Sequence, residues 1–255
     1  MYMTDIIAVV NQKGGVAKTT TTIHIGVALA QLGKNVLLVD LDSQGHLAEG
    51  FGIVADRITQ EMSDVFEGSK SLKDITMPNL RPNLDLAPSN VRLADMELTL
   101  VNMRFRESKL KRALEPVSSR YDYILLDCPP NLGLFTVNAL IAANKVLIPM
   151  ATHFWSMLGV SRLLTSIEAV KHEANPTLEL LGIIPTRFTR TVHAREVIDK
   201  TKAEVGEACH IFEHPINESV RFAEATGQGT TVFDIAPDIE GARAYRAIAK
   251  EIVDG

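Results

Sequence analysis

A glycine-rich run near the N-terminus has the composition of a phosphate-binding loop. Residues 11–22 read N-Q-K-G-G-V-A-K-T-T-T-T, between a short apolar run and a segment with helical spacing of apolar residues. Glycines let backbone N–H groups approach phosphate oxygens, and a helix N-terminus adds partial positive charge. Lys18 is placed to neutralise the β- and γ-phosphates, and the Thr19 hydroxyl can ligate magnesium. The predicted phosphate-binding residues are Gly14, Gly15, Val16, Ala17, Lys18, Thr19 and Thr20.

Three aspartates stand where apolar runs end. Asp40 and Asp42 follow the run 36–39, and Asp127 closes the run 123–126. Carboxyl ends of parallel strands form the rim where α/β proteins bind ligands, so the three are expected to converge on the nucleotide. Asp127 is predicted to hold magnesium through a water, and Asp40 to support the metal's water shell. Turn formation or helix capping is the alternative for Asp40 and Asp42.

The elements that position these residues follow from apolar spacing. Strand-length apolar runs recur at 6–10, 36–40, 84–87, 123–127, 145–150 and 181–186. Between most of them lie segments with apolar residues three and four apart, and an apolar stripe from Ile239 to Ile252 predicts a final cover helix. We expect one domain over 1–255, an α/β fold with a doubly wound, mostly parallel sheet and helices on both faces. Residues 51–82 are expected to form loops and short helices.

Composition limits the class of protein. The chain has 255 residues, 46% hydrophobic and 22% charged, and no apolar run approaches a membrane span. It has 26 Lys and Arg against 31 Asp and Glu, so binding to a polyanion would need a local basic patch. The N-terminus does not resemble a signal peptide, and Cys128 and Cys209 are expected as core residues. We therefore expect a cytoplasmic protein.

The motifs together resemble the ParA/MinD family of deviant Walker ATPases. The usual pattern G-x-x-x-x-G-K-[ST] is not met, because Gln12 and Ala17 replace its two glycines, whereas Lys13 matches the family's signature lysine. The family usually has glycine at the position of Ala17, where a methyl group should be tolerated if φ stays below zero. Residues 36–45 and 121–130 resemble the family's second strand and its Walker B strand.

This resemblance implies a mechanism. Asp42 would position the attacking water, and Lys13 would reach across a subunit boundary to the other protomer's phosphates, so that two protomers sandwich two ATP molecules. The expected catalytic residues are thus Lys13, Lys18 and Asp42, with ATP and Mg²⁺ as cofactors. A homodimer is expected in the ATP state.

An ATP-controlled dimer is expected to act on a target, and the resemblance favours DNA as that target. Family members grip phosphate backbones with C-terminal arginines, which match Arg190 and Arg221 best here, with Arg187 and Arg195 as neighbours. The alternative is a solvated helix face or, for Arg187, contact with the nucleotide base. The beginning of the first strand near the N-terminus leaves no room for a helix-turn-helix domain, so operator binding is not expected.

The sequence is less consistent with three other functions. A MinD-like membrane helix is disfavoured because the C-terminus is acidic and its isoleucines are needed in the core. Electron transfer on a bridging cluster is disfavoured by the spacing of the two cysteines, and a P-loop small-molecule ligase is weaker still. We therefore expect a ParA-like, nucleoid-associated ATPase that segregates a plasmid, chromosome region or protein cargo, with hydrolysis stimulated by a ParB-like adaptor.

Overall fold

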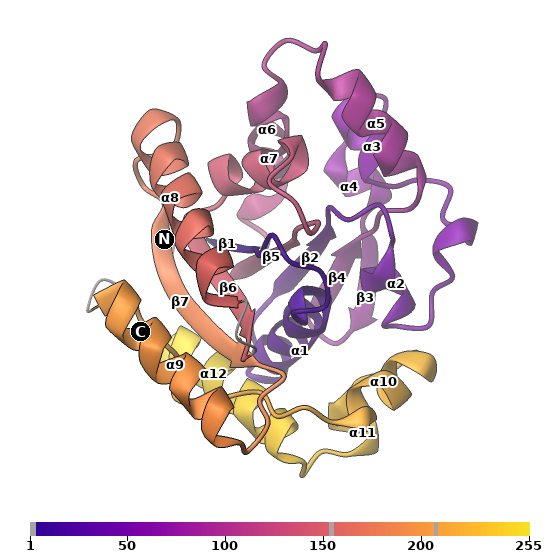
Figure 1. Cartoon of the computed structure of the whole chain (residues 1–255). Coiled ribbons are helices and arrows are strands. Elements are labelled where there is room, and N and C mark those ends of the chain that lie inside the picture. Colours follow the sequence, from indigo (N-terminus) through magenta and orange to yellow (C-terminus); the bar gives the residue numbers. More distant parts are fainter. Residues whose placement is uncertain (1–3, 153–155, 207–208) are drawn as a thin grey trace.

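A seven-stranded sheet forms the centre of the computed structural model, which describes residues 4–152, 156–206 and 209–255 (Figure 1). The strand order is β3-β4-β2-β5-β1-β6-β7, and every neighbouring pair is parallel except β3 with β4. The strands are β1 (Asp5–Val9), β2 (Val36–Asp40), β3 (Met77–Arg81), β4 (Leu84–Ala87), β5 (Tyr123–Asp127), β6 (Lys145–Ala151) and β7 (Glu179–Thr186). The predicted mostly parallel α/β sheet is confirmed.

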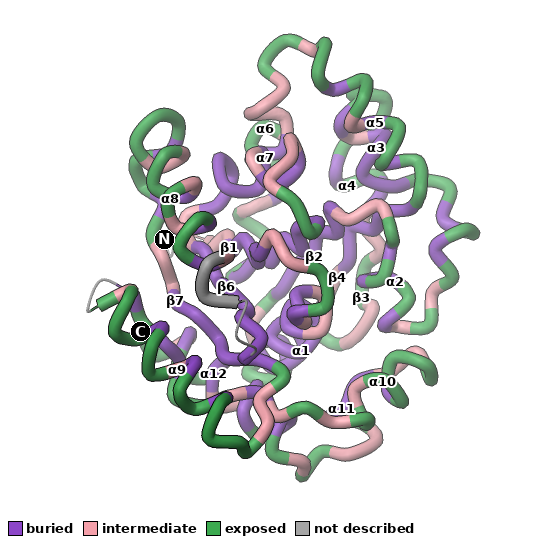
Figure 2. The backbone as a smooth tube through the Cα atoms, viewed as in Figure 1, coloured by how far each residue is buried: buried purple, intermediate pink, exposed green. Residues whose placement is uncertain are grey.

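Alternation along the strands divides the core into two layers. Ile7 and Val9 of β1 join one buried cluster, whereas Ala8 and Val10 join the other. Successive strand side chains point to opposite faces, so apolar residues at every position require cover on both sides. Buried segments accordingly run through the middle of the molecule, with exposed helix faces around them (Figure 2).

Helices supply that cover. One layer contains α1 (Lys18–Gln31), α2 (His46–Glu49), α10 (Val220–Gly227), α11 (Val232–Ile235) and α12 (Glu240–Asp254). The other contains α3 (Met62–Glu67), α4 (Leu72–Ile75), α5 (Arg92–Leu100), α6 (Lys109–Ser118), α7 (Leu134–Ala142), α8 (Ser156–Glu173) and α9 (Val192–Val205). Two 3₁₀ turns, η1 (Ala55–Arg57) and η2 (Arg106–Ser108), complete the described helices.

The last helix behaves as the apolar stripe predicts. Tyr245, Ile248 and Ile252 of α12 are buried, and the helix packs against α1. Their burial stabilises the fold rather than leaving an apolar face for insertion into lipid. In the described part of the chain, no helix combines the length and apolar character needed to cross a bilayer.

The segment 51–82 contains one element that the sequence pattern did not predict. It forms η1, α3 and α4 as expected, but its end is the antiparallel edge strand β3. The sequence M-P-N-L-R shows no apolar alternation. Pro78 is exposed at the edge of the sheet, where the N–H that proline lacks is not needed for a hydrogen bond to a neighbouring strand.

Candidate nucleotide-binding site

The glycine-rich run forms a loop between the end of β1 and the start of α1. Gly15 has φ 71° and Ala17 has φ 66° and ψ 35°, both in the left-handed region. The condition under which a methyl group at Ala17 should be tolerated, a φ below zero, is therefore not met, because the helix begins directly from a left-handed N-cap. A Cβ in this conformation costs about 1–2 kcal/mol, a strain that glycine would not have.

Lys18 points into the loop. The residue is 8% exposed, and its Nζ donates a hydrogen bond of 3.2 Å to the carbonyl oxygen of Lys13. Burial lowers the pKa of Lys18, while Asp127 and Asp42 act in the opposite direction. A partly desolvated cation interacts more strongly with an incoming phosphate than a solvated one does.

Asp127 lies below the loop with an unused oxygen. The Thr22 hydroxyl donates to its Oδ1 at 3.1 Å, whereas its buried Oδ2 has no hydrogen-bond partner among the described residues. Burial raises the pKa of Asp127 to about 6, opposed by the Thr19 hydroxyl and by Lys18. A hydrated magnesium ion beside Thr19 fits this orphaned oxygen. Within the described ranges no cluster of three or more His, Cys, Asp or Glu forms a protein-only metal site.

Asp40 and Asp42 organise the turn after β2. Asp40 is fully buried, and its two oxygens accept backbone N–H bonds from Asp42 at 3.0 Å and from Leu47 at 3.2 Å. Burial, and next the neighbouring Asp127, raise the pKa of Asp40 well above its usual value. This geometry favours the turn-forming alternative for Asp40, and its support of the metal's water shell stays a prediction.

Asp42 faces the rim. It lines a cavity of about 340 Å³ together with Pro129, Pro130 and Asn131 of the loop after β5. The Ser89 hydroxyl, at the end of β4, donates to the backbone carbonyl of Asp42. The position beside the Walker B loop suits a residue that orients a water.

A second cavity adjoins the phosphate loop on the other side. It has a volume of about 510 Å³, large enough for a nucleoside, and is lined by Gly15, Ala17, Thr20, Arg187, Ile216, Asn217, Glu218, Ser219, Val220, Phe222, Ala223, Thr226 and Tyr245. Arg187 donates to the Gly15 carbonyl at 3.1 Å and forms an ion pair with Glu218 at 2.6 Å. Its position favours the nucleotide-contact alternative over DNA contact for Arg187.

Buried aromatic rings support this cavity. The His24 ring stacks on the Tyr245 ring, with 5.1 Å between the ring centroids, and packs edge-to-face with the Phe222 ring, with 5.2 Å between the centroids. Burial lowers the pKa of His24 to about 4, so the ring is neutral at pH 7 and accepts the Val232 N–H at Nε2. His24 thus connects the first helix to the C-terminal segments that line the cavity.

The Lys13 side chain lies against α8. Its backbone N–H donates to Asn11 Oδ1 at 3.0 Å, and a Cβ on Gly159 of α8 would lie 3.4 Å from Lys13 Cε. The side chain therefore reaches the first turns of α8. Among the described residues, no heavy atom lies within 4 Å of the position that a Cβ on Gly14 would take, so this part of the loop has free space beside it.

The remaining arginines lie on the exposed surface beyond β7. An isolated bridge between Phe188 and Asn217 brings the segments of Arg190 and Arg221 together. Arg190, 70% exposed, pairs with Glu240, Arg221 pairs with Glu224, and Arg195 is exposed on α9. Exposed ion pairs contribute about 0–1 kcal/mol, so a phosphate backbone could displace these carboxylates at small cost.

Sequence reasoning missed several residues of the site. Thr22 stands one helical turn after Lys18, and that spacing was a usable signal for a shared face. Ser89 and Phe222 lie in no local motif, and only the sheet order brings them to the nucleotide side.

Comparison with known proteins identifies the family. A family model described as an AAA domain matches residues 4–180, so the chain belongs to that family. It is 39% identical to the sporulation initiation inhibitor protein Soj of Bacillus subtilis, over 98% of both chains. The chain is a ParA-like ATPase. It is also 36% identical to the chromosome partitioning protein ParA of Myxococcus xanthus, covering 97% of this chain and 87% of that protein.

One of the similar solved structures is named as a synthase rather than as a partitioning protein. A cobyrinic acid a,c-diamide synthase from Mycobacterium smegmatis, solved with an ATP analogue and magnesium, superposes with a TM-score of 0.86. It is 35% identical, with 98% of this ParA-like chain and 94% of that chain covered. The expected family and ATP hydrolase activity are confirmed, and the expected cofactors ATP and Mg²⁺ agree with the ligands of this relative.

Proposed function

We propose that this ParA-like ATPase segregates or positions a cargo by ATP-controlled binding to DNA. ATP-bound dimers coat DNA without sequence preference, and a partner protein on the cargo stimulates hydrolysis and releases them locally. The observation that supports the proposal is the different surroundings of two lysines of one loop. Lys18 is buried, with its Nζ at the Lys13 carbonyl, whereas the Lys13 side chain lies against Gly159 of α8. We infer that Lys18 binds the phosphates of its own subunit and that Lys13 reaches those of a second copy.

Phosphate binding in this proposal uses groups of the chain itself. The loop N–H groups and Lys18 would hold the β- and γ-phosphates, and Thr19 with Asp127 would hold magnesium, Asp127 through a water. Magnesium, when bound, neutralises charge that develops on the phosphate oxygens. Asp42 would orient the attacking water, and Arg187 with Glu218 would border the base and ribose.

The second lysine completes the site in the dimer. A cation added to the transferring phosphoryl group can increase the rate by about 10³ to 10⁵. Lys13 of the other copy supplies this cation, and the open space above Gly14 lets the two loops approach. Lys13→Ala should keep some ATP binding but lose ATP-dependent dimerisation and hydrolysis.

DNA binding is assigned to Arg190, Arg195 and Arg221. Each dimer presents these residues twice, so ATP-driven dimerisation doubles the phosphate contacts. Nucleoid association of a cytoplasmic protein follows from this affinity, and the segregated cargo is selected by the adaptor.

The test is binding to random-sequence double-stranded DNA with ATP, with ADP and without nucleotide, at two salt concentrations. The proposal expects binding with ATP alone, with affinity that falls steeply as salt rises. Binding to anionic liposomes instead of DNA would favour the membrane alternative, and binding to neither would contradict the partition proposal.

The similarity to a cobyrinic acid a,c-diamide synthase supports a second candidate, an ATP-dependent amide-forming ligase. Glutamine-dependent amide transfer usually needs a reactive thiolate. The chain's two cysteines are both buried, and burial raises the pKa of Cys128 well above its usual value and that of Cys209 to about 11. This chemistry disfavours the candidate. ATP consumption that depends on a corrinoid acid and ammonia, and that neither DNA nor dimerisation affects, would support the ligase candidate.

A further inference from the structure

Ser89 forms a hydrogen bond to the turn that carries Asp42. It stands two residues after β4 and is fully buried, and its hydroxyl donates to the backbone carbonyl oxygen of Asp42. The same oxygen accepts the Gly45 N–H at 3.1 Å, so both of its lone pairs are used. One of these two bonds comes from within the turn, and the other comes from the segment after the neighbouring strand.

The backbone of this turn also fixes the side chain of Asp42. Asp42 Oδ1 accepts the Gln44 N–H at 3.1 Å, and the Asp42 N–H donates to Asp40 Oδ1 at 3.0 Å. Asp40 Oδ2 accepts the Leu47 N–H at 3.2 Å. The direction of the Asp42 carboxylate therefore depends on the backbone of residues 40–47.

The turn is packed closely against the Ser89 segment. Gly45 has φ 66°, and a Cβ at this position would lie 3.0 Å from the Ser89 carbonyl oxygen and 2.7 Å from the Ala55 Cβ. Glycine suits both the left-handed conformation and the close approach. The turn consequently has little room to shift toward Ser89 or Ala55.

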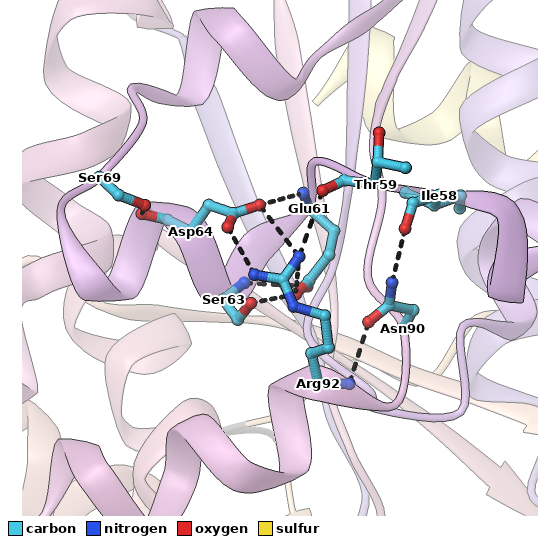
Figure 3. Close-up of polar contacts among 8 residues, drawn as sticks. All are labelled: Ile58, Thr59, Glu61, Ser63, Asp64, Ser69, Asn90 and Arg92. Carbon is cyan, nitrogen blue, oxygen red and sulfur yellow. Dashed lines mark hydrogen bonds and ion pairs between the residues drawn. The ribbon is translucent and has the colours of Figure 1, made fainter.

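The residues on either side of Ser89 are tied to a segment remote from the phosphate loop. Asn90 Nδ2 donates to the Ile58 carbonyl oxygen at 2.9 Å (Figure 3). The Pro88 carbonyl oxygen accepts the Met62 N–H at 3.0 Å. Ser89 is thus held between two anchored neighbours.

A cluster of charged groups supports these anchors. The Arg92 N–H donates to Asn90 Oδ1 at 2.9 Å, and the Arg92 guanidinium donates to Asp64 at 2.6 Å and lies 3.9 Å from Glu61 (Figure 3). The fully buried Glu61 carboxylate accepts the Ser63 N–H at 2.9 Å and the Ser63 hydroxyl. Buried polar groups that all have partners make a rigid support.

We infer that Ser89 is a positioning residue for Asp42, because it holds the turn in the one conformation that aims the carboxylate at the attacking water. The inference rests on the proposed role of Asp42 in hydrolysis and adds the residue that fixes its orientation. Ser89 lines neither of the two cavities beside the phosphate loop, so it acts through the backbone of Asp42. A displacement of about 1 Å in a catalytic group can cost about 10²-fold in rate.

The first test removes the hydroxyl and separates kcat from KM. Ser89→Ala is compared with Thr201→Val, which removes another buried hydroxyl that donates to a backbone carbonyl, in α9. ATPase rates are measured against ATP concentration at one protein concentration, and binding of a fluorescent ATP analogue is titrated. Ser89→Ala should lower kcat about tenfold, with KM and nucleotide affinity within about twofold of the wild type. Thr201→Val should keep the wild-type kcat.

Hydrogen exchange gives a second readout that needs no nucleotide. The Gly45 N–H bonds to the Asp42 carbonyl and the Leu47 N–H to Asp40, so their exchange reports opening of the turn. In the nucleotide-free protein, Ser89→Ala should speed exchange of residues 43–50 about tenfold and leave α12 at the wild-type rate. Thr201→Val should leave residues 43–50 unchanged.

Other outcomes separate the inference from the proposed function. Hydrolysis that survives in Asp42→Asn contradicts the proposed role of Asp42 and the inference with it. If Asp42→Asn abolishes hydrolysis and Ser89→Ala keeps the wild-type kcat, only the inference is overturned. A slow Ser89→Ala whose turn exchanges like the wild type, or one that loses nucleotide affinity to the same extent as rate, would likewise overturn it, since neither acts through the orientation of Asp42.

Discussion

The substitution Ala17→Gly isolates a strain that the structure places in the phosphate loop. Ala17 is the N-cap of α1 at φ 66° and ψ 35°, and its carbonyl accepts the Thr21 N–H at 2.9 Å. The substitution removes one methyl group from a left-handed residue and leaves this backbone hydrogen bond intact.

Two opposing effects set the magnitude. Relief of the left-handed conformation is worth about 1–2 kcal/mol to the folded state. The added freedom of glycine in the unfolded chain costs about 0.4–1 kcal/mol. The net expectation is an increase of about 0.5–1 kcal/mol in the free energy of unfolding without nucleotide.

Urea denaturation of the nucleotide-free protein measures this difference. A suitable control is Ala169→Gly, an exposed alanine inside α8, which should lose about 1 kcal/mol because glycine is unfavourable in a helix interior. The slope of the transition should be the same for both variants. The two alanine-to-glycine changes therefore have opposite signs.

Nucleotide affinity gives a second reading of the same variant. If the loop holds its left-handed residue without ATP, relief of strain stabilises the free and bound states alike, and affinity changes little. A loss of stability in Ala17→Gly similar to that of Ala169→Gly would refute the assignment of strain to Ala17.

Three further substitutions test other parts of the site. Burial raises the pKa of Asp127 from 3.8 to about 6, so between these pH values the folded protein binds a proton that the unfolded chain does not, and its stability falls as the pH rises. Asp127→Asn should remove this pH dependence in urea melts and raise the free energy of unfolding at pH 7 without nucleotide by about 2–3 kcal/mol. The same variant should lose magnesium-dependent ATP binding. Unchanged stability at pH 7 would contradict a buried carboxylate. Arg187→Ala removes contacts to Gly15 and Glu218 and should weaken ATP binding about tenfold in a fluorescence titration, with DNA affinity unchanged at saturating ATP; the reverse pattern would return Arg187 to the DNA surface. Arg195→Ala should weaken DNA binding equally for all sequences and reduce the salt slope by about 1 per arginine removed, and an unchanged slope would exclude a phosphate contact.

Local patterns predicted the parts of the site that are neighbours along the chain. The phosphate loop, Thr19 and Asp127 lie at the ends of β1 and β5, and apolar runs at those positions indicate where such ends fall. Parallel strands meet at one edge of a sheet, so a carboxylate at the end of one predicted strand can be placed beside the loop at the end of another.

Contacts between distant segments could not be predicted in this way. Arg187 reaches Gly15 only because β7 lies next to β6 at the sheet edge and a bridge from Phe188 to Asn217 brings in the following segment. The sign of φ at Ala17 depends on how the loop closes onto α1, which composition does not specify. The edge strand β3 was missed because edge position, rather than apolar alternation, allows its sequence.

The central claim is that Lys13 acts in the site of the other copy, and mixing two inactive variants tests it most directly. Lys13→Ala and Asp42→Asn, each expected to have lost hydrolysis, are combined in equal amounts and the ATPase rate is measured. In a mixed dimer, the site with intact Asp42 receives Lys13 from its neighbour, so activity should return, up to about one quarter of the wild-type rate, since half of the dimers are mixed and half of their sites complete. No recovery, with mixed dimers demonstrated, would show that Lys13 serves its own subunit and would contradict the account.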